Sequence, residues 1–245
     1  MIRLASAVAA LLLALSVAAL GQGFGLQVAD TAGPGNVGAM RVTGGFVMGK
    51  FAEADTAFYG ARYTYNVLED LSVFGDVGAL DVEDPYELSA SFQIGALYTL
   101  PVETLPVDLG VRGTVFMPVL DDVSENGMSV ETKVWGASLM LIGSGCLEAV
   151  PEVSLYGGLG LTHWEAEWKT SVPNDPALVP SKQETENLLG MRIAAPTLEA
   201  IARDRGTELA LTAGALYQFS EAWSVYGEVS DVEDPLFGAG VRFDF

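Results

Sequence analysis

The chain has 245 residues, of which half are apolar and only 18% are charged. Its 12 Lys and Arg residues against 32 Asp and Glu residues leave a net charge of −20, which argues against nucleic-acid binding because phosphate recognition needs clustered basic side chains. One Cys and one His exclude a framework of internal disulfides and a metal centre rich in Cys or His.

Residues 1–21 have the pattern of a secretory signal peptide. A basic residue lies near the start, residues 4–20 form an unbroken, weakly apolar run, and small residues near its end favour cleavage just before Gln22. An uncleaved membrane anchor is the alternative, but the run is short, rich in alanine and followed by glycines. Residues 22–37 are then expected to be an N-terminal periplasmic segment that precedes the folded domain.

Residues 38–245 alternate between apolar side chains and small or polar ones. Over residues 88–100, Phe92 and Ile94 share one face while Gln93 falls on the other, which is the period of a β-strand. Comparable runs begin near Ala39, Ala57, Leu71, Val107, Ser129, Val153, Glu208, Trp223 and Phe237. The sequence therefore predicts about ten strands of roughly 9–14 residues, a length that suits strands tilted across a bilayer. Eight strands is the alternative if two hairpins are overcounted.

The connections between these runs are of two kinds. One set is mostly tight: 66–70, 100–106, 143–151 and 219–222. The other is acidic, mostly proline-containing and longer on average, although its first loop, 52–55, is short; the longer loops are 81–87, 120–128, 170–206 and 231–235. This pattern predicts an up-and-down meander whose two ends face different surroundings, with both termini in the periplasm if the strand number is even. Within the longest loop we expect a short helix over residues 188–203, interrupted by Pro196.

The composition of the two strand faces indicates which one lies inside. The face opposite the apolar one is dominated by Gly, Ser and Thr, which suits the crowded interior of a narrow closed barrel. Strand phase also places four arginines and four carboxylates on this face: Arg41, Arg62, Arg112, Arg242, Asp76, Asp108, Glu228 and Asp244. Because buried charges must be paired, we predict that they form a structural charge network in the barrel lumen. The alternative is eight solvated surface residues.

Aromatic residues of the apolar face gather near the tight-turn end of the predicted strands. They are Tyr63, Tyr65, Tyr98, Tyr217, Phe219, Trp223, Phe243 and Phe245. Amphipathic rings collected at one level predict a girdle at a membrane–water boundary, so the apolar face is expected to contact lipid.

Together these features resemble the small outer-membrane β-barrels of diderm bacteria, the OmpA-like and OmpX-like superfamily with its porin-like relatives. The resemblance is carried by the signal peptide, the alternating strands and the final stretch 237–245, which ends in phenylalanine. It implies an all-β fold, a transmembrane antiparallel up-and-down barrel, in the bacterial outer membrane, surrounded by outer-membrane lipid and lipopolysaccharide. It also implies that Phe243 and Phe245 form the signal by which the barrel-assembly machinery recognises the C-terminal strand.

The sequence offers little catalytic chemistry. His163 is the only imidazole, and with Glu165 or Glu167 it invites comparison with barrel hydrolases, but no motif supplies a partner serine. A histidine at the membrane rim, among interfacial tryptophans, is the favoured interpretation, and Cys146 is read as a turn cysteine. We predict no catalytic residue, no cofactor and no enzymatic activity.

The acidic loops are candidates for binding Ca²⁺ or Mg²⁺, which prefer carboxylate oxygens. The carboxylates concerned are Asp81, Glu83, Asp84, Glu87, Asp121, Asp122, Asp231, Glu233 and Asp234. None has the spacing of an EF-hand, so solvated loop charge is the default interpretation. The long loop 170–206 is the expected surface for a ligand or partner, because variable function resides in loops on a rigid scaffold.

The sequence thus predicts an integral outer-membrane barrel with a structural or surface-interaction role through its acidic extracellular loops. A barrel this narrow is filled by its own side chains, so a wide water channel is excluded. Three alternatives remain: a narrow channel for ions or small solutes, a barrel hydrolase, and a soluble secreted or periplasmic β-protein.

Overall fold

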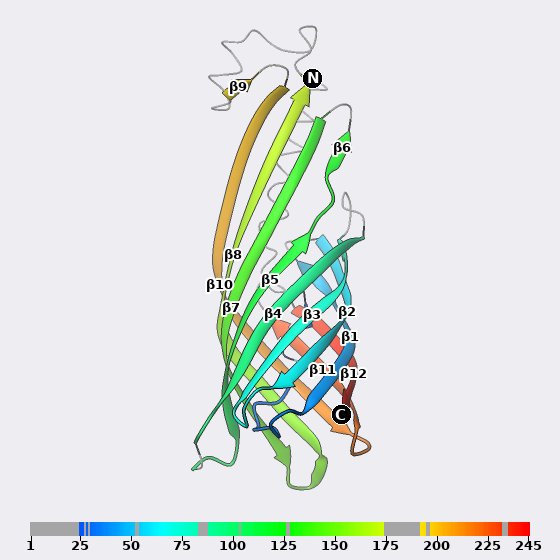
Figure 1. Ribbon diagram of the computed structural model, residues 1–245, viewed down its shortest axis with the longest axis vertical. Coiled ribbons are helices and arrows are strands. Elements are labelled where there is room, and N and C mark those ends of the chain that lie inside the picture. The colour runs from blue at the N-terminus through cyan, green and yellow to red at the C-terminus, as the bar shows by residue number, and fades with distance from the viewer. Residues whose placement is uncertain are drawn as a thin grey trace.

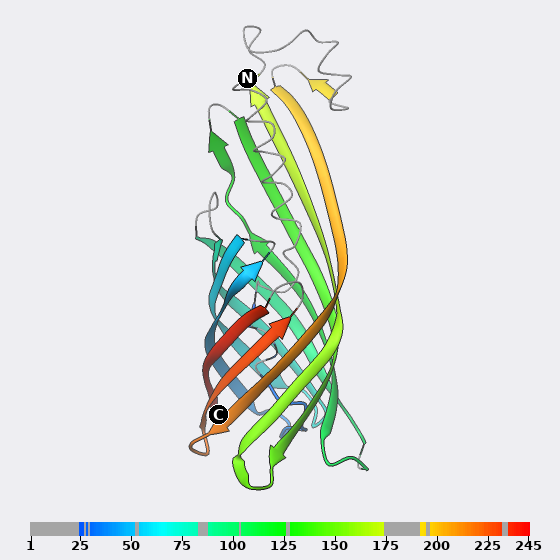
Figure 2. The same ribbon diagram turned by 180° about the vertical axis from the view of Figure 1, so that it is seen from behind.

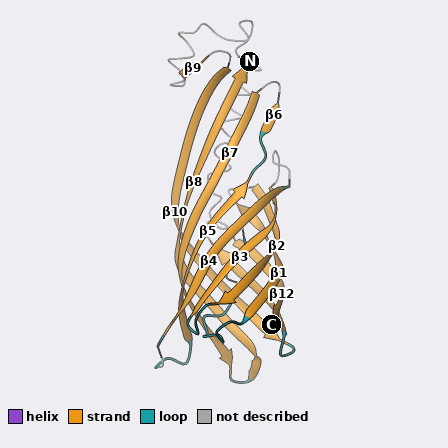
Figure 3. Ribbon diagram, in the orientation of Figure 1, coloured by secondary structure: helices purple, strands orange, loops and turns teal. Residues whose placement is uncertain are grey.

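The computed structural model describes residues 25, 26, 28, 30–51, 54–82, 88–102, 104–125, 128–173, 192–194, 197–231 and 235–245. The predicted signal peptide, residues 1–21, lies outside the described residues. Within these ranges every regular element is a strand, and no helix is long and apolar enough to cross a bilayer (Figure 3).

Ten strands of the described chain form a closed wall. They are β1 (Met40–Phe51), β2 (Ala54–Asn66), β3 (Leu71–Val82), β4 (Ser89–Leu100), β5 (Asp108–Val119), β7 (Met128–Leu147), β8 (Val150–Pro173), β10 (Thr197–Gln218), β11 (Trp223–Asp231) and β12 (Pro235–Asp244). Two short strands, β6 (Val123–Glu125) and β9 (Arg192–Ala194), pair with β7 and β10. Each wall strand pairs antiparallel with its neighbours in the chain, and β12 pairs with β1 to close the barrel (Figure 1). The ten-stranded prediction is confirmed, and the eight-stranded alternative is wrong.

The two faces of the wall are as strand phase predicts. Ile94 is 67% exposed on the outer surface, whereas Arg62, on the inner surface, is only 2% exposed. A soluble β-protein would bury its apolar face and hydrate its charged face, because burying apolar surface drives folding in water. The observed order is the reverse, as it is in a barrel surrounded by lipid.

Large rings also fill the lumen, which the expectation of a small-residue interior did not include. The ring of Phe58 lies where a Cβ on either Gly60 or Gly78 would collide with it. Other lumen rings lie directly opposite a glycine of the neighbouring strand: Phe74 opposite Gly95, Phe116 opposite Gly136, Tyr156 opposite Gly214 and Tyr226 opposite Gly240. The glycines therefore leave space for rings from adjacent strands.

Three neighbouring strands are much longer than the rest. β7, β8 and β10 have 20, 24 and 22 residues, and they continue far beyond the wall at the end opposite the C-terminus (Figures 1 and 2). We call residues 128–136, 164–173 and 197–206 of these strands the extension.

Strand pairing occupies much of the predicted loop 170–206. The pairing of β8 with β10 runs to Pro173 opposite Thr197, so the loop is shorter than expected. The helix expected over residues 188–203 is wrong in its described part, where β9 and β10 are found. Ladder hydrogen bonds to β8 outweigh the helical propensity of this alanine-containing stretch, since propensity is a weak preference.

The segment before β1 also differs from expectation. Residues 22–37 are predicted to be periplasmic, but Leu26, Val28 and Ala32 are fully buried inside the barrel. Residues 36–38, just before β1, are exposed. The chain therefore enters the lumen from the tight-turn end.

Candidate functional site

A buried ion pair lies at the centre of the lumen. Arg62 of β2 and Asp76 of β3 are directly opposite each other in the sheet. Arg62 donates from Nε to Asp76 Oδ1 at 2.7 Å and from Nη2 to Oδ2 at 2.8 Å, and both side chains are excluded from solvent. This bidentate geometry offsets the large cost of removing both charges from water.

A second ion-pair cluster joins the first and last strands. Arg41 of β1 lies opposite Asp244 of β12, and its Nε donates to Asp244 Oδ1 at 2.7 Å. Arg242 donates from Nε to Asp244 Oδ2 at 2.9 Å. Both arginines also reach Asp30, with Nη1–Oδ1 distances of 2.6 Å from Arg41 and 3.4 Å from Arg242. Two arginines and two carboxylates thus bridge the seam where the barrel closes.

The remaining inward-facing predicted residues use rings as partners. The guanidinium of Arg112 lies 4.8 Å from the centroid of the Phe74 ring, and that of Arg62 lies 4.5 Å from the same centroid. A ring quadrupole attracts cations placed over its face. Glu228 accepts a hydrogen bond of 3.0 Å from the hydroxyl of Tyr156.

Asp108 is the exception among the eight predicted lumen residues. It begins β5 and is exposed at the tight-turn end, and none of the ion pairs found in the described chain involves it. Asp30, which the sequence analysis did not single out, is the fourth carboxylate beside the four arginines. Burial opposes ionisation of Asp30, but Arg41 and Arg242 outweigh it and hold the pKa of this carboxyl below its ordinary value.

The segment that contains Asp30 is bound to the lumen wall along its length. We call its described residues, 25, 26, 28 and 30–33, the plug segment. Arg62 donates to the carbonyl oxygens of Val28, at 2.6 Å, and Leu26, while the Leu26 amide donates to Asp76 Oδ2 at 3.1 Å.

Farther along the plug segment, Ala32 is held from two opposite directions. Its amide donates to Ser144 Oγ of β7 at 2.8 Å, and its carbonyl oxygen accepts from Thr99 Oγ1 of β4 at 2.8 Å. The plug segment therefore contacts strands on several sides of the barrel. Sequence periodicity gives no signal for this docking, because the segment precedes the first strand.

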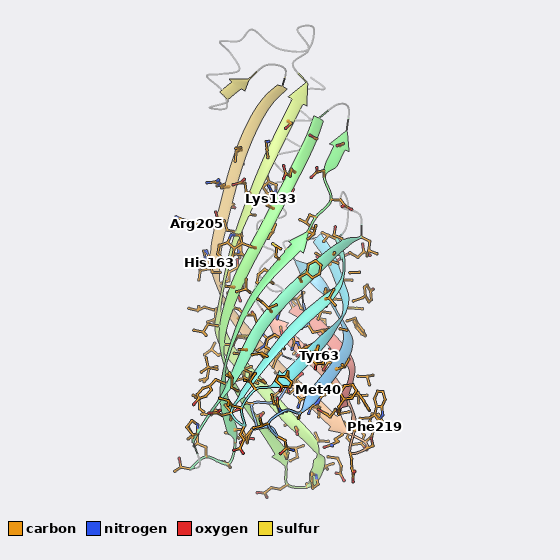
Figure 4. All side chains as sticks on the ribbon, in the orientation of Figure 1. Met40, Tyr63, Lys133, His163, Arg205 and Phe219 are labelled. Atoms are coloured by element: carbon orange, nitrogen blue, oxygen red, sulfur yellow. The ribbon has the colours of Figure 1, made fainter. Side chains whose placement is uncertain are left out.

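The outer surface carries an apolar band with aromatic residues at its lower edge. Tyr63 and Phe219 project outward near the tight-turn end (Figure 4), and the other predicted girdle residues lie at the same end of their strands. Phe243 packs between Trp223 and Phe245, with ring centroids 4.6 Å apart in each case. Above this girdle the outer surface is apolar, and it surrounds a lumen that contains charged side chains. This arrangement of the two faces identifies the fold.

The fold is that of an outer-membrane β-barrel. No protein-family model and no curated protein matches the sequence. Among solved structures, OprG from Pseudomonas aeruginosa is 13% identical, with 88% of this chain and 99% of that chain covered and a TM-score of 0.38. Ail of Yersinia pestis is 15% identical, with 86% and 100% covered and a TM-score of 0.37. The N-terminal barrel domain of Pseudomonas aeruginosa OprF is 12% identical, with 85% and 98% covered and a TM-score of 0.33. Likenesses this distant assign no function, and the fold rests on the strand pairing and sidedness described above.

His163 lies on the outer surface, away from the lumen charges (Figure 4). Its Nδ1 is 2.9 Å from Thr207 Oγ1, and its ring lies edge-on to Trp135 with centroids 6.0 Å apart. A tryptophan neighbour fits the prediction for this histidine, and its position at a membrane rim stays a prediction. Cys146 is exposed near the β7–β8 turn, with its sulfur 3.4 Å from Ser154 Oγ.

No group of three or more His, Cys, Asp or Glu side chains that could hold a metal ion occurs among the described residues. Of the acidic loop residues considered above, Glu83, Asp84, Glu87, Glu233 and Asp234 lie outside the described residues. Divalent-cation binding by the loops therefore stays a prediction.

Proposed function

We propose that the protein is an integral protein of the bacterial outer membrane and acts at the cell surface through the extension. The observation that carries the proposal is an abrupt change along the outward face of β8. Leu155, Leu159 and Leu161 are exposed and apolar, and at the same phase they give way to His163 and then to charged residues. An outward face that turns from apolar to charged along one strand is expected where the strand leaves the bilayer.

The neighbouring strands change at the same level. Opposite Glu165 lie Trp135 on β7 and Arg205 on β10, so an exposed tryptophan is next to the first charged residues. Tryptophan favours the headgroup region, which supports a second membrane boundary here, opposite the girdle at the tight-turn end.

The outward face of the extension carries both signs of charge. Its charged residues are Glu131, Lys133, Glu165, Glu167, Lys169, Arg203 and Arg205. Lys133 pairs with Glu131 at 2.8 Å and Arg203 pairs with Glu167 at 2.6 Å. We therefore propose a polar macromolecular partner that meets a surface of mixed charge, in place of the purely acidic loop surface that the sequence predicts. The wall below it would be surrounded by outer-membrane lipid and lipopolysaccharide.

Assembly into the membrane is proposed to depend on the C-terminal strand. Phe245 is exposed beyond the end of β12, and its amide donates to the carbonyl oxygen of Met40 at 2.9 Å. Its ring and that of Phe243 are accessible beside Trp223, where the barrel-assembly machinery would read them.

Labelling of single cysteines on intact cells tests the proposal. The reagent is a maleimide carried on a polymer too large to cross the outer membrane. The native Cys146 is exposed at the tight-turn end and should not react, whereas Arg205→Cys in a Cys146→Ser background should react. Both should react after the cells are broken. Reaction of Cys146 on intact cells, or recovery of the protein in the aqueous fraction without detergent, would rule out the proposed orientation or location.

A further inference from the structure

The plug segment occupies space that the lumen wall itself does not fill. Leu26, Val28 and Ala32 are fully buried among the wall side chains. The lumen is therefore wide enough to hold an extended polypeptide chain over the stretch that these residues span, from the level of Asp76 to that of Ser144. Because protein interiors are close-packed, removal of the segment would leave a bore of that width at this level.

Asp30 provides a carboxylate where the wall offers two guanidinium groups. Arg41 and Arg242 both direct Nη1 at the same Asp30 oxygen, Oδ1. Among side chains that are not exposed, the wall beside the plug segment contributes four arginines and the carboxylates of Asp76, Glu228 and Asp244, so without Asp30 their sum is 4 − 3, one positive charge. Asp108, whose carboxylate lies beside Gly33, is exposed at the tight-turn end. Asp30 thus takes the position that a small free anion would fill.

The plug segment is attached in a way that allows it to leave. Its polar contacts with the wall are hydrogen bonds and ion pairs to wall side chains, its apolar residues pack among wall side chains, and it adds no strand to the sheet. It joins β1 through the glycine-rich residues 33–38, where Gly38 has a φ of +82°. Only glycine adopts that backbone region without strain, so this connection can serve as a hinge.

We infer that the plug segment closes a narrow conduction path through the barrel, and that Arg41 and Arg242 form a site for small anions when the segment undocks. Asp30 is then an internal competitor for that site. The inference goes beyond the proposed surface role and does not depend on it.

Single-channel recording in planar bilayers with potassium chloride tests the inference. The full exported chain is compared with a variant lacking residues 25–33 and with Asp30→Lys, which places a third positive charge between two arginines. Both variants should show discrete openings that occupy at least about tenfold more of the recording time than in the parent, since tenfold corresponds to the loss of only 1.4 kcal/mol of docking. The reversal potential in a salt gradient should indicate a preference for chloride.

Two controls separate unplugging from damage to the barrel. Glu148→Lys makes the same charge change at an exposed turn of the same end and should leave the parent behaviour unchanged. A synthetic peptide of residues 22–33 should block the deletion variant when added from the tight-turn side. The heat-dependent gel shift reports whether each variant is a folded barrel. Folded variants that stay silent, that prefer potassium, or that ignore the peptide would overturn the inference.

Discussion

The buried charges of the lumen depend on partners of three kinds: a residue directly opposite in the sheet, an aromatic ring, or a residue of the plug segment. Arg62 and Asp76 face each other across β2 and β3, and their two parallel hydrogen bonds replace the water that burial removes. Removing one partner leaves the other charged and desolvated, which costs much more than the pair itself contributes.

Asp76→Asn is therefore expected to lower the free energy of unfolding by about 3–5 kcal/mol, because Arg62 would become an uncompensated buried charge. Glu167→Gln is the matched control, since it breaks the exposed pair with Arg203 and should cost less than about 1 kcal/mol. Urea unfolding in detergent, monitored by the heat-dependent gel shift, measures both. Similar costs for the two variants would contradict a desolvated lumen pair.

Glycines that leave room for aromatic rings are a second feature of individual lumen residues. Gly78→Ala would direct a methyl group against both the backbone carbonyl oxygen of Tyr59 and the Phe58 ring, and it is expected to destabilise the barrel by about 1–3 kcal/mol, as overpacking does. Gly44→Ala, where an added Cβ meets nothing within 4 Å, should be neutral or slightly stabilising. The same unfolding assay compares them. Phe58→Leu should reduce the cost of Gly78→Ala only in part, because the Tyr59 carbonyl oxygen stays in place, and it should leave the effect of Gly44→Ala unchanged.

Strand phase predicts most inward-facing charges but not the full set. Arg62, Asp76 and Glu228 follow from a period of two residues alone. Asp108 shares that phase, yet it begins its strand, so solvent reaches it at the end of the wall. Asp30 lies outside any strand, and its position is decided by the arginines that attract it, which periodicity cannot reveal.

Among the elements, β10 shows why a local pattern can mislead. Its first residues contain Leu, Ala and Ile at spacings compatible with a helix, whereas their ladder partners lie on β8, beyond the long connection. The shorter strands are predicted well because each is bounded by a turn and paired with its neighbour in the chain. Long-range pairing at the extension leaves no comparable mark in the sequence.

The plug segment should respond to acid through Asp30. Its pKa is lower when docked than its ordinary value of 3.8, so the ion pairs with Arg41 and Arg242 contribute fully above that value. The contribution is lost as the pH falls through the lowered pKa. Channel opening in the parent protein should therefore rise only below about pH 4. In Asp30→Asn it should already be raised at neutral pH and show no such rise on acidification, and the same acid response in both would show that another group is responsible.

The C-terminal strand is expected to act mainly during assembly. Phe245→Ala removes an exposed ring and should reduce the amount of barrel assembled in cells severalfold. The stability of protein refolded in detergent should change by less than about 1 kcal/mol, because the ring is not part of the core. Quantitative immunoblotting of the membrane fraction, beside the unfolding assay, separates the two effects. A stability loss large enough to explain the lower amount would argue for a structural role.

For the whole molecule, the positions of the charged and apolar side chains matter more than their numbers. The chain carries a net charge of −20, yet the four lumen arginines are balanced by the four carboxylates of Asp30, Asp76, Glu228 and Asp244, so the excess negative charge lies outside this cluster. The strand pairs are local, so up-and-down closure follows from alternation and turn spacing. Which of the two faces meets lipid is the claim on which the account depends.

Spin labelling of adjacent residues on β4 tests that claim most directly. In a Cys146→Ser background reconstituted into lipid vesicles, a nitroxide at Ile94→Cys should collide often with oxygen, which concentrates in lipid, and rarely with a water-soluble nickel complex. A nitroxide at the buried neighbour, Gln93→Cys, should be protected from both. If the label at Ile94 instead meets the nickel complex while the one at Gln93 meets oxygen, the apolar face does not contact lipid and the membrane account is wrong.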